Sequence, residues 1–288
     1  MPNTSSLIAM FPHLLTLMRV DKPIGWLLLL WPTLWALWIA ADGEPTGKLI
    51  WIFGIAVFVM RCAGCVINDY ADRDIDPAVE RTEQRPLAAG HVQPRQALVL
   101  FGVLCLIALT LLWMLPMRVW PWSIPAIILT ISYPYMKRFI QAPQLVLGMA
   151  FSFGIPMVYV ALARPFDSVF WLLVMINLCW VMVFDTQYAM SDREDDLKVG
   201  VKSSAILFGQ WDRHILAVLQ IGIVFMLMLL ANLLNLGAEF YLSIAVVIAL
   251  FIYQQWLTKE RGRQACFQAF INNAWVGAII WFGLLSTL

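Results

Sequence analysis

Two stretches of acidic residues have the composition to bind a cation and an anionic substrate together. The first is N-D-Y-A-D-R-D-I-D, at 68–76, and the second is D-T-Q-Y-A-M-S-D-R-E-D-D, at 185–196. These stretches, with Glu80 and Glu83, hold 11 of the 18 acidic residues in a chain that is 61% hydrophobic. Carboxylates this dense repel one another unless a cation lies between them. Because ionisable groups at membrane level are costly, both stretches are candidate functional sites.

Each stretch places several oxygen ligands along one face of an expected helix. If the preceding helix continues through the first stretch, Asp69, Asp72 and Asp76 recur at i, i+3 and i+7. Asn68 adds a neutral amide oxygen beside them. The second stretch gives a similar stripe, made of Asp185, Tyr188, Asp192 and Asp196. The candidate metal ligands are Asn68, Asp69, Asp72, Asp76, Asp192 and Asp196.

Oxygen ligands without histidine or cysteine suit Mg²⁺ rather than Zn²⁺. Mg²⁺ takes one or two carboxylates, keeps several waters and completes its shell with substrate phosphate. Two acidic stripes around a diphosphate would provide that arrangement. The alternative is a solvated acidic loop, which describes Glu80, Glu83 and Glu194 better than it describes the stripes.

Basic and aromatic side chains accompany the acids and are candidates for binding a diphosphate. Negative charge grows on a diphosphate as the bond to it breaks, so cationic donors are needed besides a metal. The alternative for any one of them is a topology determinant that faces the cytoplasm. Arg61 lies within an apolar segment and must face an interior, as a substrate contact or in a structural ion pair. The candidates are Lys22, Arg61, Arg73, Tyr133, Lys137, Arg138, Tyr188, Lys198 and Lys202.

The elements that position these residues are expected to be membrane-spanning helices. A helix needs about 20 apolar residues to cross the hydrocarbon core. A composition with 61% hydrophobic and 13% charged residues is typical of integral membrane proteins, and the net charge of +1 argues against nucleic-acid binding. The sequence therefore predicts an all-α polytopic membrane protein with one domain, 1–288. The nine expected spans are 24–41, 49–68, 96–115, 120–136, 144–163, 168–190, 213–235, 239–257 and 268–287.

The basic residues predict how the chain crosses the membrane. Between the expected spans, one side carries 15 Lys and Arg residues, and the other carries only Lys48, Arg118 and Arg164. The richer side is expected to be cytoplasmic, which places both acidic stretches and the N-terminus inside and the C-terminus outside. Leu7 to Met18 is expected to form an amphipathic helix on the membrane surface.

A short internal echo suggests two related halves. D-R-D-I-D, at 72–76, and D-R-E-D-D, at 192–196, each follow a Tyr-Ala pair and close an even-numbered span. Membrane proteins built from repeats often place their binding site between the halves. A weak repeat with its motifs at 68–76 and 185–196 is therefore expected.

Three patterns resemble the UbiA superfamily of intramembrane aromatic prenyltransferases. They are N-D-x-x-D-x-x-x-D at 68–76, Y-x-x-x-K at 133–137 and D-x-x-x-D at 192–196. Longer segments, which begin at Asp21, Asp185 and Gly200, resemble the branch that prenylates 4-hydroxybenzoate in bacterial ubiquinone biosynthesis. The resemblance covers nearly the whole chain.

The resemblance implies a bundle of about nine transmembrane helices around a central cavity that opens to the cytoplasmic side of a bacterial inner membrane. It implies Mg²⁺ as cofactor, polyprenyl diphosphate and 4-hydroxybenzoate as substrates, and a lateral opening to the lipid bilayer for the isoprenoid tail. The residues implied for the metal and diphosphate are Asn68, Asp72, Asp76, Asp192 and Asp196, assisted by Tyr133, Lys137 and Arg138.

Several alternatives stay open at the level of sequence. Related branches use naphthoate or homogentisate as acceptor, and Lys22, Arg61 and Arg138 are all candidates for holding an acceptor carboxylate. Asp192 or a neighbouring carboxylate is a candidate base for the ring proton. A CDP-alcohol phosphotransferase is disfavoured because no D-G-x-x-A-R occurs. A cation-coupled transporter is disfavoured because the acids stand at helix ends beside Arg and Lys.

Overall fold

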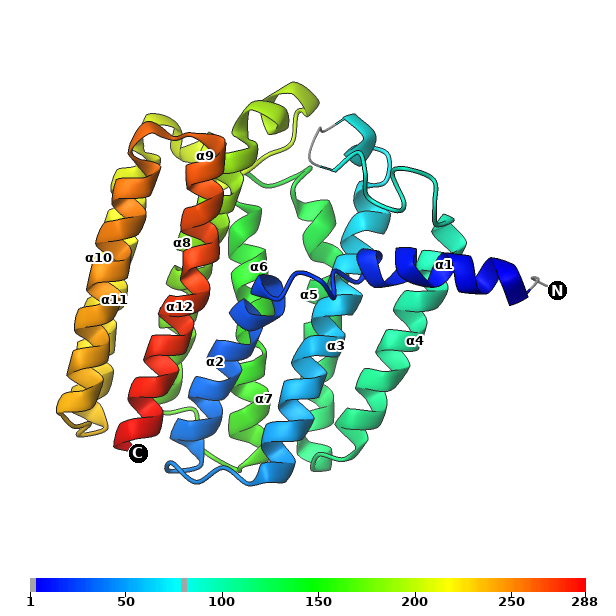
Figure 1. The fold of residues 1–288 in the computed structure, drawn as a ribbon. Helices are drawn as coiled ribbons and strands as arrows, with labels where there is room; N and C mark the ends of the chain where they lie inside the picture. The colour runs from blue at the N-terminus through cyan, green and yellow to red at the C-terminus, as the bar shows by residue number, and fades with distance from the viewer. Residues whose placement is uncertain (1–3, 79–81) are drawn as a thin grey trace.

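The computed structural model describes residues 4–78 and 82–288, and every regular element in that part of the chain is a helix (Figure 1). The expected all-α architecture is therefore confirmed. The α-helices are α1 (Thr4–Leu17), α2 (Ile24–Ala40), α3 (Gly47–Asp72), α4 (Pro94–Trp113), α5 (Trp120–Met136), α6 (Pro143–Ser152), α7 (Gly154–Ala161), α8 (Ser168–Val199), α9 (Ser204–Phe208), α10 (Asp212–Leu233), α11 (Ala238–Leu257) and α12 (Arg263–Thr287). Short 3₁₀ turns are η1 (Asp76–Ala78), η2 (Met117–Val119), η3 (Gly209–Trp211) and η4 (Thr258–Glu260).

Seven helical segments of the described residues are long and apolar enough to cross a membrane, so the chain is a multi-pass membrane protein. Two further expected spans correspond to α2 and α5, which have 17 residues each. That length is the lower limit for crossing the hydrocarbon core. The count of nine therefore stays a prediction. The seven segments are Gly47–Asp72, Pro94–Trp113, Pro143–Ala161, Ser168–Val199, Ser204–Leu233, Ala238–Glu260 and Arg263–Thr287.

The helices form one bundle with α3, α4 and α5 on one side and α8, α10, α11 and α12 on the other (Figure 1). α2, α6 and α7 lie between these two groups. α1 lies across the direction of the bundle, and its last residue, Leu17, is fully buried against it (Figure 1). This orientation agrees with an amphipathic helix that lies in the membrane surface.

Aromatic side chains fill the contact between α2, α8 and α12. The fully buried rings of Trp35 and Trp180 lie 5.2 Å apart between centroids. α12 approaches α2 closely because Gly277 has no side chain. A Cβ at this position would overlap the Trp31 ring. The Trp35 indole donates a hydrogen bond of 3.0 Å to the Gly277 carbonyl. Large buried rings dominate core energetics, so this contact fixes α8, which carries the second acidic stretch.

A chain of buried amides joins the four helices of the second group. The side-chain oxygen of Gln254 on α11 accepts hydrogen bonds from Gln187 of α8 and Gln220 of α10, at 3.0 and 2.9 Å. Gln254 also donates to Asn272, and Asn273 donates to Gln187, both from α12, at 2.9 and 2.7 Å. Hydrogen bonds between membrane helices contribute about 0.6–2 kcal/mol each. These five amides therefore fix the order and register of α8, α10, α11 and α12.

The three basic residues expected on the poorer side lie at the end of the bundle away from the acidic stretches. Arg164 donates to the Ala40 carbonyl and forms an ion pair with Asp42, which ties the α7–α8 connection to the end of α2. Arg118 donates to the Ala161 carbonyl at 2.8 Å. The expected single domain and its weak internal repeat stay predictions.

Candidate active site

A cavity of about 1190 Å³ lies inside the bundle. Its polar end contains side chains from both acidic stretches, although 116 residues separate the first aspartates, Asp69 and Asp185. The remainder is mostly apolar and extends to Phe53, Leu115 and Met157. One cavity therefore offers a charged end and an apolar chamber.

Twelve of the residues predicted for the site line this cavity. They come from three α-helices, the turn η1 and three connections, so the fold brings together residues that are far apart in the sequence. Their functional roles stay predictions. The twelve are Lys22, Arg61, Asn68, Asp69, Asp72, Asp76, Tyr133, Lys137, Tyr188, Asp192, Asp196 and Lys202.

Three other predicted residues do not line the cavity. Arg138 donates to the carbonyl of Ala71 at 2.7 Å and so braces the end of α3. Arg73 folds back over the ring of Tyr70, with 4.7 Å to the centroid. Lys198 is largely exposed and pairs with Asp195. The side chains of these three residues contact other parts of the protein and do not line the cavity.

The first stretch is held differently from the expected continuous helix. α3 ends at Asp72, and Asp76 begins the separate turn η1, so the expectation of one helical face through Asp76 is wrong. The physical reason is Pro77, which has no N–H to donate to the Arg73 carbonyl and whose ring would clash with that carbonyl in a continuous α-helix. The Asp76 carboxylate still lies in the cavity wall, where Arg85 donates to both of its oxygens at 3.0 and 2.9 Å.

Cations already accompany the carboxylates of the first stretch. Asp69 forms ion pairs with Arg19 at 2.5 Å and with Arg85 at 3.1 Å, and Lys137 lies 3.1 Å from Asp72. Burial raises the pKa of the Asp76 carboxyl, although the charge of Arg85 opposes that rise. Burial pulls the pKa of Lys137 down, but the charge and hydrogen bond of Asp72 bring it above its ordinary value. Each of the three buried carboxylates of the first stretch, Asp69, Asp72 and Asp76, therefore has a cationic partner.

The second stretch belongs to one 32-residue helix, α8. Asp185, Tyr188, Asp192 and Asp196 all line the cavity, as the helical spacing predicted. α8 ends at Gly200, whose positive φ of 72° closes the helix in the left-handed conformation that glycine adopts without strain. A single helix therefore carries this stripe from the middle of the cavity to its polar end.

Several cavity residues were missed as site candidates by sequence reasoning. Arg19 and Arg85 lie outside the periodic segments, so only their positive charge marked them, and neither was selected as a site residue. Gln144 accepts a hydrogen bond from the Ser204 amide at 3.0 Å and also lines the cavity. Asp185 belonged to the predicted stripe but was not selected, although its position on that stripe was a sufficient signal.

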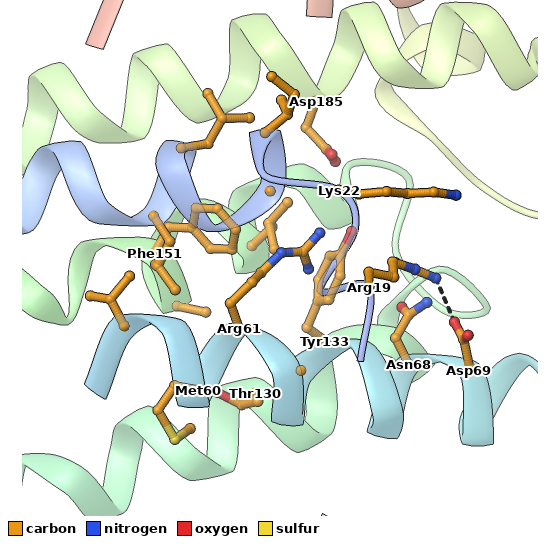
Figure 2. A pocket seen from close by; sticks show the side chains of 18 of the residues that line it. Arg19, Lys22, Met60, Arg61, Asn68, Asp69, Thr130, Tyr133, Phe151 and Asp185 are labelled. Atoms are coloured by element: carbon orange, nitrogen blue, oxygen red, sulfur yellow. Dashed lines mark hydrogen bonds and ion pairs between the residues drawn. The ribbon is translucent and has the colours of Figure 1, made fainter. Parts of the chain in front are cut away.

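Arg61 points into the cavity between the polar end and the apolar chamber (Figure 2). Its guanidinium lies beside Tyr133, with Phe151 on the side away from Asp69 (Figure 2). The guanidinium can lie against α2 because Gly25 has no side chain, and a Cβ at this position would overlap it. Within residues 4–78 and 82–288 it forms no hydrogen bond or ion pair, and its position in the cavity favours a ligand contact over a structural ion pair.

The donor set at the polar end fits Mg²⁺ that is shared with a substrate. In the described part of the chain, no three acidic, His or Cys side chains converge closely enough to hold an ion by themselves. Carboxylates from α3, η1 and α8 nevertheless face one space. Mg²⁺ needs only one or two of them when substrate phosphate and water supply the other ligands.

Aromatic rings line the chamber next to the polar end. The ring of Tyr188 lies 5.0 Å from that of Phe270 and 6.2 Å from that of Phe267, and all three line the cavity. Phe184 and Phe151 continue the aromatic wall, 6.1 Å apart. Ring faces attract cations, so this wall suits an intermediate that carries positive charge on carbon.

Comparison with solved structures supports this architecture. A UbiA homolog from Aeropyrum pernix K1 superposes with a TM-score of 0.79 at 25% identity, over 93% of this chain and 98% of that one. A UbiA homolog from Archaeoglobus fulgidus bound to GPP and Mg²⁺ superposes with a TM-score of 0.72 at 17% identity, over 96% of this chain and 100% of that one. The second likeness shows the fold alone.

Comparison of sequences assigns the family. A relative from Aeromonas hydrophila subsp. hydrophila, named 4-hydroxybenzoate octaprenyltransferase, is 55% identical over 93% of this chain and 94% of its own length. A relative of the same name from Tolumonas auensis is 52% identical, with 93% and 94% covered. The model of the UbiA prenyltransferase family matches residues 29–282. The chain therefore belongs to the UbiA prenyltransferase family.

Proposed function

We propose that the protein transfers a polyprenyl group from polyprenyl diphosphate to the ring carbon of 4-hydroxybenzoate ortho to the hydroxyl. The products are 3-polyprenyl-4-hydroxybenzoate and diphosphate, and the reaction is a step of ubiquinone biosynthesis. The observation that carries this proposal is the single cavity in which two acidic stretches and several cations adjoin an apolar chamber. The names of relatives at 50–55% identity support the same acceptor and donor class.

The residues at the polar end bind the diphosphate head. Asn68, Asp72, Asp76, Asp192 and Asp196 would hold Mg²⁺, which neutralises charge on the leaving diphosphate when it is bound. Lys137 lies 3.1 Å from Asp72. Its ammonium can therefore donate to a phosphate oxygen next to the metal ligands. Donors fixed in advance stabilise charge as it develops without reorganising at the moment of reaction.

The chamber protects the carbon centre that the departing diphosphate leaves behind. Water would convert an allylic cation to an alcohol, so the reaction needs a site that excludes water. Tyr188, Phe267 and Phe270 present aromatic surface next to the acidic stripe. This surface stabilises positive charge. The apolar remainder of the cavity accommodates the isoprenoid tail.

Arg61 orients the acceptor. Its guanidinium, which has no partner among the described residues, can form a bidentate pair with the carboxylate of 4-hydroxybenzoate, and this pair would direct the phenol ring toward the diphosphate end. The ring carbon ortho to the hydroxyl attacks the allylic carbon, and the ring then loses its proton to a carboxylate of α8. Asp185 and Asp192 both line the cavity and are the candidates for this base. Of the three candidate anchors for the carboxylate, Lys22, Arg61 and Arg138, the geometry favours Arg61.

The protein is proposed to lie in a bacterial inner membrane with its N-terminus and acidic end in the cytoplasm and its C-terminus on the other side. The excess of basic residues around the acidic end supports this orientation. Soluble acceptor and Mg²⁺ would then enter from the cytoplasm, while the donor arrives through the lipid.

The direct test is product formation by detergent-purified protein from geranyl diphosphate and labelled 4-hydroxybenzoate. We expect prenylated product with Mg²⁺ and none with EDTA, and we expect added Mg²⁺ to restore turnover. Naphthoate and homogentisate serve as acceptor controls. Turnover with one of these and none with 4-hydroxybenzoate would reject the acceptor and keep the prenyl transfer. Absence of turnover with every acceptor, in protein that is shown to be folded by a cooperative thermal transition, would reject the enzymatic function.

Arg61→Met is expected to raise the KM for 4-hydroxybenzoate about 10–100-fold, because hydrogen bonds to a charged group contribute about 1.5–3 kcal/mol. The methyl ester of 4-hydroxybenzoate, which lacks the charge, is expected to react equally well with both proteins. The measurement is kcat/KM for acid and ester. An equal loss on both acceptors would assign Arg61 to packing or to the diphosphate, and Arg138→Met serves as the matched control.

A further inference from the structure

The cytoplasmic-end segment of α8 requires support from outside the helix. α8 has 32 residues and is therefore about 48 Å long, against a hydrocarbon core of about 30 Å. The segment S-D-R-E-D-D, at 191–196, has no apolar residue that could anchor it in lipid. A projecting helix end with few apolar contacts frays easily. Asp192 and Asp196 lie on this segment, so their direction depends on what holds it.

A buried carboxylate on α10 holds one edge of this segment. Asp212 is fully buried, and Arg193 of α8 donates to its Oδ2 at 2.5 Å. The same guanidinium donates to the carbonyls of Ala205 at 2.6 Å and Gly209 at 3.3 Å. Arg261, in the connection between α11 and α12, donates to both oxygens of Asp212 at 2.9–3.1 Å. This carboxylate thus joins α8 to α10 and to the connection between α11 and α12.

A second ion pair holds the other edge. Arg263 of α12 lies 2.8 Å from Asp195, which is 6% exposed. At about 100° per residue, Arg193 lies about 100° from Asp192 in one direction and Asp195 about 60° in the other. The two ion pairs therefore flank the acidic stripe and oppose rotation of α8 about its axis. Breaking either one removes the restraint on one side of the helix, so that the carboxylates of the stripe can turn from the cavity.

We propose that Arg193 and Asp212, together with the Asp195–Arg263 pair, are positioning residues that keep Asp192 and Asp196 directed into the cavity. The inference rests on the proposed function, because it takes these two aspartates as ligands of the metal and diphosphate. Neither Arg193 nor Asp212 lines the cavity. Their effect is therefore transmitted through the rotation of α8 and not through substrate contact.

The test measures Mn²⁺ binding in the presence of inorganic diphosphate, by loss of the electron paramagnetic resonance signal of free Mn²⁺. Asp212→Asn is expected to raise the Kd for Mn²⁺ about 10–100-fold, the usual effect of removing a group that orients metal ligands. Asp42→Asn, which breaks an ion pair at the opposite end of the bundle, is expected to leave the Kd unchanged. A folded Asp212→Asn protein with the wild-type Kd would overturn the proposal.

Two further variants separate the possible outcomes. Asp192→Asn reports the metal site itself: if it binds Mn²⁺ as the wild type does, the proposed function fails at this site before the positioning role is tested. Arg263→Gln breaks the opposite ion pair at a side chain that is 41% exposed, so it is the safer variant if Asp212→Asn does not fold. We expect Arg263→Gln to weaken Mn²⁺ binding about tenfold. A wild-type Kd in this variant would also contradict the proposal.

Discussion

Asp72→Asn is expected to lower the rate of prenyl transfer about 10²–10³-fold, the effect of removing one preorganised group that stabilises transition-state charge. Asp72 is 7% exposed at the end of α3, lines the cavity and pairs with Lys137 at 3.1 Å. Asparagine keeps the shape and one oxygen but removes the charge that would bind Mg²⁺. The measurement is kcat/KM for geranyl diphosphate with saturating 4-hydroxybenzoate.

The matched control is Asp74→Asn, two residues along the same stretch. Its side chain is 76% exposed and pairs only with the neighbouring Arg73 within the described residues. We expect Asp74→Asn to retain wild-type turnover. Equal losses in both variants would mean that the stretch acts through its net charge, and full activity of Asp72→Asn would remove Asp72 from the proposed metal site.

Asp192→Asn is expected to give a loss of the same size, about 10²–10³-fold, because the second stretch supplies the opposite wall of the same polar end. Asp192 is 6% exposed on α8 and lines the cavity. Raising the Mg²⁺ concentration should recover part of the activity, since a weakened ligand set is filled by mass action. The measurement is the Mg²⁺ dependence of the initial rate.

Glu194→Gln is the control for this second stretch, since Glu194 is exposed and does not line the cavity. It is expected to show the wild-type rate and Mg²⁺ dependence. If Asp72→Asn is inactive and Asp192→Asn is fully active, the two stretches do not act in one site, whatever their proximity in the fold.

The fold class and the second acidic stripe were predictable from the sequence because both depend on local periodicity. Apolar segments of about 20 residues predict spans, and the spacing of Asp185, Tyr188, Asp192 and Asp196 predicts a shared helical face. The structure places all four of these side chains along the cavity. The sequence also indicated that Arg61 faces an interior, which its position beside Tyr133 confirms.

The remaining features depend on contacts between distant segments. Arg19 and Arg85 meet Asp69 from two connections that have no helical period, so no spacing could place them in the site. Asp76 lies outside the predicted helix because Pro77 cannot continue it. The proline is a local signal, but the prediction followed the spacing of the aspartates instead. Arg138 comes directly after the Y-x-x-x-K pattern, but its side chain donates to a carbonyl of α3. The direction of this side chain depends on how α5 packs on α3, which the sequence does not show.

The amides of Gln187, Gln220, Gln254, Asn272 and Asn273 have a consequence for biogenesis. Those of Gln187, Gln220 and Gln254 enter the lipid before a partner on a later helix has been synthesised, because the partners extend from α8 to α12. An unpaired polar group in hydrocarbon is unfavourable, so α8 and α10 are expected to remain near the insertion machinery or near water until α12 arrives. The last helix thus completes hydrogen bonding for the whole second group, and a chain that ends before Asn272 is expected to be removed by membrane quality control.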